Sequence, residues 1–245
     1  MTSPTSEGGR PDLTILMPVY NEAATVAEAI RTMLAERLPV ESLELIVIND
    51  GSADGSGEIL DAGPWPDTVR VVHHERNQGK GAAIRTGLEV ARGRITTIMD
   101  ADLELSPADL ARLLPPILEG RADVVFGARS FPRHTARQVR YLVGNVGVSF
   151  AASVLYQRRI HDIMTCYKAM ETELFRSLEL KESGFGIEAE ITARLLQSRS
   201  RLVEVPVSYE PRTRKEGKKL TMFDGVRVLR TLARCRFRRR PTSTR

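Results

Sequence analysis

LELIVINDGS, residues 43–52, carries the most information about the architecture of this chain of 245 residues. Its first six residues are nearly all apolar, which is typical of a strand buried on both faces of a sheet. The polar residues Asn49-Asp50-Gly51-Ser52 follow at once. An apolar strand that ends in a polar turn indicates an α/β sheet in which ligands bind at the carboxyl ends of the strands.

Similar patterns recur on both sides of this stretch. Further strands are predicted at 13–19, 69–73, 95–99, 123–126 and 201–207. Helices are predicted at 22–34 with Asn21 as its cap, and at 82–91, 137–156, 186–196 and 221–237. Because strands and helices alternate, we expect an α/β fold with a mostly parallel sheet flanked by helices and a C-terminal helical extension. We divide the chain into a disordered N-terminus at 1–11, a domain at 12–211 and a basic segment at 212–245.

The composition favours a folded, intracellular protein. Hydrophobic residues make up 42% of the chain and charged residues 27%, so a packed core is expected. Cys166 and Cys235 are far apart and form no CxxC, which argues against a disulfide framework or a zinc site and fits a reducing cytosol. Residues 1–10 lack the apolar core of a secretory signal. We therefore expect a cytoplasmic location.

The net charge of +5 is unevenly distributed. Residues 212–245 contain 13 Lys/Arg and 2 Asp/Glu, a net charge of +11, so the remaining residues carry −6. A basic segment of this kind suits anionic partners such as phosphates, acidic lipid headgroups or nucleic acid, although a solvated chain end has the same composition.

The strongest candidate site is Asp100-Ala101-Asp102, directly after the predicted strand at 95–99. In an extended segment, residues two apart point in the same direction, so both carboxylates and Glu104 would converge on one cation. Carboxylate oxygens suit Mg²⁺ or Mn²⁺, which commonly bridge protein carboxylates and a diphosphate. We therefore predict Asp100, Asp102 and Glu104 as metal ligands.

Other ligand motifs are absent. No GxGxxG and no GxxxxGK[ST] occurs, which argues against a nicotinamide dehydrogenase and a P-loop NTPase. The histidines show no metal-binding spacing and are interpreted as structural or surface residues; they are His73, His74, His134 and His161.

Eight stretches together resemble family 2 glycosyltransferases of the GT-A type, and most closely the dolichol- or polyprenol-phosphate mannosyltransferase group. They are PVYNE (18–22), INDGSADGS (48–56), NQGKGAAIRTG (77–87), MDADLELSP (99–107), VVFGAR (124–129), DIMTCYKAM (162–170), GFGIEAEI (184–191) and EVPVSYEPRTRKEGKKLTMFDG (204–225). The resemblance covers almost the whole chain and implies a GT-A (Rossmann-like) fold. It implies a nucleotide half at about 12–130 and an acceptor half at about 131–211.

The resemblance also assigns roles to single residues. The nucleotide base and ribose pocket would be lined by Pro18, Tyr20, Glu22, Ile48 and Asp50, and Asp100 and Ala101 would lie against the nucleotide. Asp102 would bind the metal, and Glu104 stands where many relatives carry Gln. Phosphate groups of donor or acceptor would be held by Arg129, Arg212 and Lys218. Asp102, Arg129 and Arg212 are thus the predicted catalytic residues.

Two reactions stay open at this point. In one, a hexose, with mannose from GDP-mannose favoured, is transferred with inversion to a polyprenyl phosphate, whose anionic oxygen needs no strong base. In the other, a sugar from a UDP-sugar is transferred to a hydroxyl of a soluble acceptor, and a carboxylate must take the proton; Glu188 and Glu190 are the candidates. A binding protein for nucleic acid is a rival from another class. The acidic triplet argues against it, because carboxylates repel phosphate unless a metal intervenes.

The last expectation concerns membranes. Many relatives carry C-terminal transmembrane helices, and this chain shows no apolar run of that length. Its 141–156 segment suits a buried helix or an interfacial one. The 221–237 segment predicts a basic amphipathic helix with Met222, Val226, Leu229 and Ala233 on one stripe, which either packs on the body or touches an anionic bilayer at the inner face.

Overall fold

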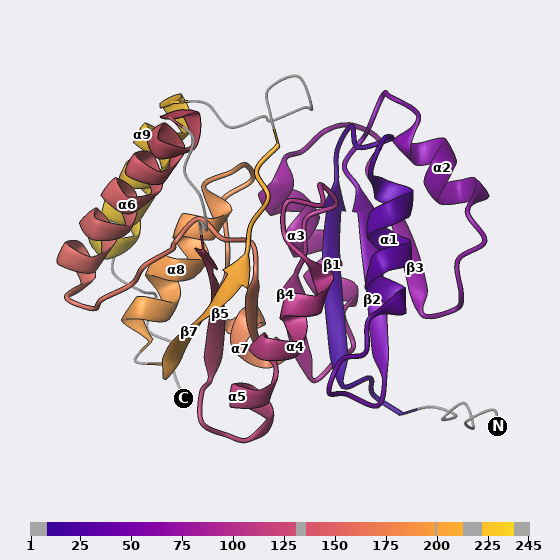
Figure 1. Ribbon diagram of the computed structural model, residues 1–245, viewed down its shortest axis with the longest axis horizontal. Helices are drawn as coiled ribbons and strands as arrows, with labels where there is room; N and C mark the ends of the chain where they lie inside the picture. Colours follow the sequence, from indigo (N-terminus) through magenta and orange to yellow (C-terminus); the bar gives the residue numbers. More distant parts are fainter. Residues whose placement is uncertain (1–8, 131–135, 199, 213–221, 238–245) are drawn as a thin grey trace.

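The computed structural model describes residues 9–130, 136–198, 200–212 and 222–237, with the side chains of 136–143 and 222–224 outside the description. The described strands form one seven-stranded sheet in the order β3-β2-β1-β4-β6-β5-β7, with helices around it (Figure 1). The strands are β1 (Leu13–Val19), β2 (Leu43–Asn49), β3 (Val69–His73), β4 (Ile95–Ile98), β5 (Val124–Ser130), β6 (Lys168–Glu171) and β7 (Leu202–Ser208). The helical elements are α1 (Val26–Ala35), α2 (Ser56–Ala62), α3 (Lys80–Val90), η1 (Pro107–Asp109), α4 (Leu110–Leu113), α5 (Pro115–Leu118), α6 (Ala136–Tyr156), α7 (Thr172–Ser177), α8 (Ile187–Gln197) and α9 (Met222–Phe237). The predicted α/β, GT-A-type architecture is confirmed.

Strands β1 to β4 form the parallel part of the sheet. β1 pairs in parallel with β2 and with β4, and β2 pairs in parallel with β3. Nearly every residue of β1 and β2 is buried, because helices cover both faces there. The register places Val19 opposite Asn49, and Asn49 opposite His73. The carboxyl ends of these strands therefore meet at one edge, where the polar turns gather.

Strands β5, β6 and β7 form the mixed part. β6 runs antiparallel to both β4 and β5, and β5 pairs in parallel with β7. β6 is not predicted from the sequence, because it is short and begins with Lys168. That lysine is fully buried: its Nζ donates to the carbonyl oxygens of Ile163 (3.1 Å) and Thr165. A buried lysine satisfied by backbone carbonyls is invisible to hydropathy.

Two local expectations are wrong. Asn21 does not cap α1, which begins after Thr25 without a side-chain cap; its Oδ1 instead accepts a hydrogen bond from the Ala53 N–H (2.9 Å). Arg10 and Pro11 were assigned to a disordered N-terminus. In the structure Arg10 donates to the Arg92 carbonyl oxygen (3.0 Å), and the Pro11 carbonyl accepts the N–H of Arg94 (2.9 Å). Both segments are fixed by bonds to distant backbone, which local patterns do not reveal.

Helices α6 and α9 pack side by side at one side of the molecule, beyond α8 (Figure 1). The Tyr156 hydroxyl donates to the Leu232 carbonyl oxygen (2.8 Å), which joins the two helices. On α6, Val146, Phe150 and Val154 recur every four residues and are all exposed, Phe150 by 69%. The alternative of an interfacial helix thus fits this face of α6 better than full burial.

Helix α9 exposes two members of its predicted apolar stripe, whereas Ala233 is half-buried and the side chain of Met222 lies outside the description. Val226 is 67% exposed and Leu229 43% exposed, whereas Val228 and Leu232 are buried against the body. The idea that the whole stripe packs on the body is therefore wrong. Four arginines flank the stripe and are exposed: Arg227, Arg230, Arg234 and Arg236. We call the exposed residues Val146, Phe150, Val154, Val226, Leu229 and Phe237, with these arginines, the α6–α9 surface. Within the described residues, no helix is long and apolar enough to cross a bilayer.

Candidate active site

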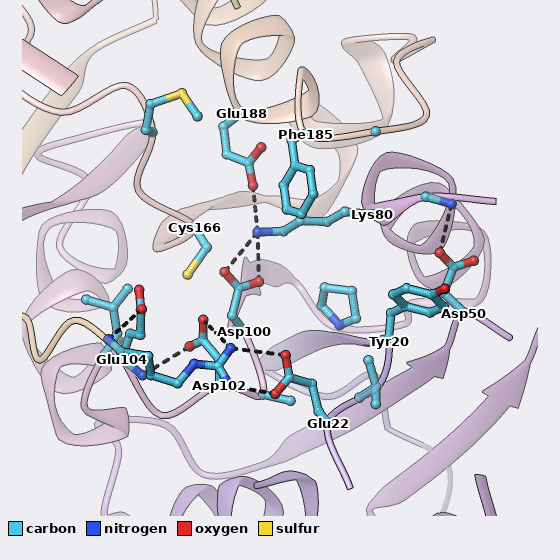
Figure 2. Close-up of a pocket in the computed structure, with 18 of the residues that line it drawn as sticks. Tyr20, Glu22, Asp50, Lys80, Asp100, Asp102, Glu104, Cys166, Phe185 and Glu188 are labelled. Atoms are coloured by element: carbon cyan, nitrogen blue, oxygen red, sulfur yellow. Dashed lines mark hydrogen bonds and ion pairs between the residues drawn. The ribbon is translucent and has the colours of Figure 1, made fainter. Parts of the chain in front are cut away.

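A cavity of about 460 Å³ opens at the carboxyl edge of the sheet. It lies between the parallel part and the mixed part, and residues of both line it (Figure 2). The lining includes ten of the predicted site residues: Pro18, Tyr20, Glu22, Asp50, Asp100, Ala101, Asp102, Glu104, Arg129 and Arg212. A cavity of this size is within the range of small-ligand sites.

Two predicted residues stand apart from this group. Ile48 does not line the cavity; its side chain is fully buried in β2, where it would contact any Cβ at Gly87 of α3. The structure therefore gives the Ile48 side chain a place in the core, and its role in the nucleotide pocket stays a prediction. Lys218 lies outside the described residues.

Lys80, the first residue of α3, joins two carboxylates at one end of the cavity. Its Nζ lies 2.7 Å and 2.9 Å from the two carboxylate oxygens of Asp100 and 2.6 Å from Oε1 of Glu188, as Figure 2 shows. Burial lowers the pKa of Lys80, but Asp100 and Glu188 outweigh it and hold the pKa well above its usual value. The ammonium therefore stays charged and fixes Asp100. Oε2 of Glu188 is buried without a hydrogen-bond partner in the described chain.

Arg212, just past β7, forms a second ionic group with carboxylates of the parallel part. Its Nη1 and Nη2 lie 2.7 Å and 3.1 Å from the two carboxylate oxygens of Glu22, and Nη2 lies 3.4 Å from Oδ2 of Asp102. Its backbone N–H donates to Oε1 of Glu104 (2.8 Å), whose Oε2 accepts the Tyr209 hydroxyl (2.9 Å). The guanidinium of Arg212 thus lies between Glu22 and Asp102 in the cavity, where it would contact a bound anion.

Asp102 is the carboxylate whose charge is least compensated. Burial raises its pKa, as do the charges of Asp100 and Glu104, whereas hydrogen bonding to the Glu104 N–H and the charge of Arg212 oppose the rise; the resulting pKa is about 7. A cation next to Asp102 would relieve this repulsion. The donor chemistry at Asp102 therefore fits a hard divalent ion.

The predicted set of three metal ligands is not assembled in the structure. Among the described residues, no three His, Cys, Asp or Glu side chains are arranged to hold a metal ion. The segment from Asp100 to Glu104 is a turn rather than an extended strand end: Leu103 has a φ of 59°, and the Glu104 N–H bonds Oδ1 of Asp102 (3.0 Å). The three carboxylates are therefore not aligned along one extended strand. Metal binding by Asp102 stays a prediction.

Arg129 enters the cavity from β5 in a bidentate pair. Its Nε and Nη2 donate to the carboxylate oxygens of Asp162 at 2.7 Å and 2.9 Å, and its guanidinium lies 5.0 Å from the centre of the Tyr209 ring. Burial lowers the pKa of Arg129, but the charge and hydrogen bonds of Asp162 outweigh this effect, so the pKa lies above its ordinary value. Asn145 also donates to Asp162 (3.0 Å). The pair fixes the direction in which the remaining donor, Nη1, can act.

Asp50 organises the turn that carries Lys80. Its carboxylate accepts the backbone N–H groups of Gln78 (2.9 Å) and Gly79 (2.8 Å) and a bond from Nδ1 of His74 (2.7 Å). Nε2 of His74 in turn meets the Thr86 hydroxyl (3.0 Å). His74 is therefore a structural residue, as predicted, and Asp50 shapes one wall of the cavity.

Several cavity residues were not singled out by the sequence reasoning. They are Lys80, Met164, Cys166, Phe185 and Tyr209. All five lie in the quoted motifs, so the motifs indicated the right segments but did not indicate that these residues line the cavity. Glu188 lines the cavity, but Glu190 does not: its Oε2 accepts the N–H groups of Lys181 (2.8 Å) and Glu182 (2.7 Å). Glu190 as a general base is therefore wrong, because residues two apart on a helix lie about 200° apart around its axis.

Comparisons with known proteins agree with this geometry. The profile described as "Glycosyl transferase family 2" matches residues 14–178. Polyprenol monophosphomannose synthase of Mycolicibacterium smegmatis is 30% identical over 81% of this chain and 77% of its own length. Undecaprenyl-phosphate mannosyltransferase of Micrococcus luteus is 31% identical over 83% of this chain and 85% of its own. Glycosyltransferase AglD of Haloferax volcanii is 27% identical, and this chain spans only 37% of its length.

A solved structure shares the fold. Glucosyl-3-phosphoglycerate synthase from Mycobacterium tuberculosis, crystallised with Mn²⁺, UDP and glucosyl-3-phosphoglycerate, superposes with a TM-score of 0.68 at 20% identity. The match covers 92% of this chain and 80% of that one.

Proposed function

The chain belongs to glycosyl transferase family 2 and is a glycosyltransferase, and from that premise we propose that it moves a hexose, mannose from GDP-mannose, to a polyprenyl phosphate at the cytoplasmic face of a membrane. Two relatives are named for mannosyl transfer to polyprenol or undecaprenyl phosphate, which supports this class of acceptor. The acceptor's lipid tail requires an enzyme that works at a bilayer surface.

The observation that carries the proposal is the α6–α9 surface. Two packed helices expose apolar side chains at helical spacing, and the arginines on α9 flank them. Large exposed apolar side chains gathered on two packed helices are typical of a surface that meets a protein or a membrane. Each Lys or Arg near an anionic leaflet contributes about 1 kcal/mol, and a shallow apolar stripe adds to that attraction. An anionic bilayer is therefore the partner that this surface fits.

The chemistry of the cavity supports an anionic acceptor. Breaking the bond between sugar and diphosphate builds negative charge on the leaving nucleotide, which cationic side chains stabilise. We assign this role to Arg129 and Arg212. The carboxylates of Asp100, Glu104 and Glu188 already accept hydrogen bonds or ion pairs. An acceptor phosphate oxygen is ionised before it attacks, so the transfer does not require any of them as a base.

A divalent ion, Mg²⁺ or Mn²⁺, is proposed to bind at Asp102, with Asp100 and Glu104 as its predicted neighbours. When bound, such an ion supplies Lewis-acid stabilisation of the diphosphate. Asp102 then receives the charge compensation that its raised pKa shows to be lacking. Of the residues predicted to hold the base and ribose, Pro18, Tyr20 and Asp50 form the wall next to the Lys80 turn.

The second candidate is transfer from a UDP-sugar to a hydroxyl of a soluble acceptor. Of the two predicted general bases, Glu188 lines the cavity and its Oε2 has no hydrogen-bond partner in the described chain, so Glu188 would take the proton of the hydroxyl. This reaction needs no membrane, so the α6–α9 surface distinguishes the two.

A transfer assay on the full-length protein tests the proposal. GDP-mannose and UDP-glucose are each offered with Mn²⁺ and either undecaprenyl phosphate in anionic vesicles or a soluble alcohol acceptor, and labelled product is separated by extraction. We expect GDP-mannose and the lipid to give the product, and vesicle binding to weaken with salt. Product only with the soluble acceptor would instead establish the second candidate.

Surface variants connect the assay to the structure. Phe150→Ser combined with Val226→Ser removes two exposed apolar side chains and should lower both vesicle binding and lipid glycosylation. Val203→Ser, at an exposed apolar position on β7, is the matched control and should change neither. Ligand binding to the native state raises the melting temperature. The shifts caused by GDP, UDP and Mn²⁺ should be the same in all variants, because the substitutions lie outside the active-site cavity. Equal lipid activity in wild type and double variant would remove the surface from the proposal.

A further inference from the structure

A second cavity, of about 360 Å³, lies between α8, α9 and the segment 181–184. Its charged lining consists of four cations and two carboxylates: Lys181, Arg194, Arg227 and Arg234, with Glu182 and Glu190. None of the predicted donor or acceptor residues contributes to it. The cavity is therefore separate from the candidate active site, although Gly184 lines both.

Both carboxylates in this lining are already engaged. Glu190 accepts two backbone N–H groups, and its Oε1 lies 3.5 Å from Nη2 of Arg194. Glu182 accepts the Thr231 hydroxyl (3.1 Å) and forms an ion pair with Arg234. These two pairs leave the lining with the charge of two further cations.

Those cations are Lys181 and Arg227. Neither side chain makes a hydrogen bond or an ion pair with the described part of the chain, and both are exposed to the cavity's mouth or solvent. The lining thus has a surplus of two positive charges, which a doubly charged anion would match.

A third cation points to a missing acceptor. The Nε of Arg194 is buried and finds no hydrogen-bond partner in the described residues. Buried N–H groups in native proteins are nearly always paired, so an isolated one next to a cavity indicates a ligand atom or an ordered group. Guanidinium groups favour phosphate oxygens because their N–H fork matches the oxyanion.

We propose that this cavity is a binding site for a phosphate group, held by Lys181 and Arg227, with the guanidinium of Arg194 in the same lining. The ligand is a phosphate monoester or inorganic phosphate, whose charge of nearly −2 balances the surplus. It reaches the site either from solution or as a lipid headgroup, because Arg227 and Arg234 belong to α9, whose outer face forms part of the α6–α9 surface.

The site is connected to the donor side of the active site through the 181–184 segment. The Ala82 N–H donates to the Ser183 carbonyl oxygen (3.1 Å), and Arg85 donates to that of Glu182. A Cβ at Gly79 or Gly81 would collide with these two carbonyls, so both positions must stay glycine. Lys80 lies between the two glycines. An anion that fixes the segment therefore also fixes Lys80, and we expect it to strengthen nucleotide binding; this one consequence rests on the proposed function.

Isothermal titration of the full-length protein with inorganic phosphate, in a buffer of matched chloride, tests the site directly. We expect saturable binding to wild type and affinity about tenfold lower in Arg227→Ala and in Lys181→Ala, since each removes one charge-assisted contact. Arg230→Ala, on the same helix but outside the cavity lining, is the control and should bind as wild type. No saturable binding to wild type, or equal affinity in all four proteins, would overturn the proposal.

Two further arms separate the sources and the sites. Vesicles with phosphatidic acid carry a phosphomonoester headgroup; if the lipid is the source, Arg227→Ala should weaken binding to them more than Arg230→Ala does. If free phosphate is the source, the two variants should bind these vesicles equally. Arg212→Ala damages the candidate active site and should leave phosphate binding intact. Loss of phosphate binding in Arg212→Ala would place the anion in the first cavity and overturn the proposal, whatever the transfer assay shows.

Discussion

In the active site, the parallel part of the sheet contributes most of the acids together with Lys80, and the mixed part contributes two arginines together with Glu188. Behind β1 and β4 come Glu22, Asp100 and Asp102, whereas the mixed part contributes Arg129 from β5 and Arg212 from beyond β7. The acids follow their own strands directly and are therefore readable along the chain. Arg212 meets Glu22 and Asp102 only in the folded sheet, in which β6 lies between β4 and β5. The positions of the acids are therefore set by the local sequence, and those of the arginines by the tertiary structure. We expect substitutions of the two groups to lower activity to different extents.

The largest effect is expected from the acidic side. Asp102→Asn should lower kcat/KM by at least about a hundredfold, because electrostatic stabilisation of the leaving group through the proposed ion depends on this carboxylate. Steady-state transfer in Mn²⁺ and the melting temperature should be measured together. Glu104→Gln should be milder, since the amide keeps one oxygen for Tyr209 or the Arg212 N–H. Normal turnover by a folded Asp102→Asn protein would contradict the proposal that Asp102 binds the ion.

The cationic side should come next. Arg129→Ala and Arg212→Ala should each lower kcat/KM by roughly one to two decades, since a charge-assisted hydrogen bond to phosphate is typically worth about 1.5–3 kcal/mol. Kinetics of both variants against nucleotide-sugar concentration give the measurement. Arg31→Ala, exposed on α1 and outside both the cavity lining and the α6–α9 surface, is the control. If both variants match wild type, these arginines only neutralise Glu22 and Asp162.

A smaller catalytic effect, with a larger effect on stability, is expected from Asp162→Asn. Loss of the carboxylate leaves Arg129 with a weaker, uncharged partner, which should lower the free energy of unfolding by up to about 3 kcal/mol. Activity should fall by about tenfold, because Arg129 persists but is less well oriented. Denaturant unfolding and kcat/KM on the same sample separate the two. A variant as stable as wild type would mean that the uncharged amide at this position and the Tyr209 ring suffice to hold Arg129.

The smallest effect is a dependence on pH. Burial and acidic neighbours raise the folded-state pKa of Asp102 to about 7, whereas an unfolded Asp titrates near about 3.9. The folded state therefore binds a proton more tightly, so this group's contribution to stability is present below about pH 4 and is lost as pH rises towards about 7. In the absence of ligand, Asp102→Asn should remove that slope. Melting temperatures of both proteins from pH 5 to pH 8 provide the comparison; parallel curves would contradict the raised pKa.

The structure differs from the sequence interpretation where neighbours distant in the chain decide. Asp100, Asp102 and Glu104 were expected to converge as in an extended strand, but the segment forms a turn at Leu103, and among the described residues they do not make a set of three metal ligands. Ile48 was placed in the pocket by its motif, yet helices on both faces of β2 enclose it. Glu190 shares a motif with Glu188, but it turns to the 181–184 segment. In each case the sequence identified a relevant segment but did not predict the direction in which the side chain points.

By itself, the sequence determined the strands of the parallel part, the polar turns behind them and the family, because hydrophobic periodicity and strand-end turns are local properties of the chain. It also determined that α9 carries an apolar stripe among arginines. Only the tertiary structure decided that part of the stripe faces outward beside α6, that Arg212 meets Glu22 and Asp102, and that Lys80 joins Asp100 to Glu188. The physical reason is that burial and ion pairing depend on which distant surfaces come together, and this is set by how the whole sheet packs with its helices rather than by the order of residues within one segment.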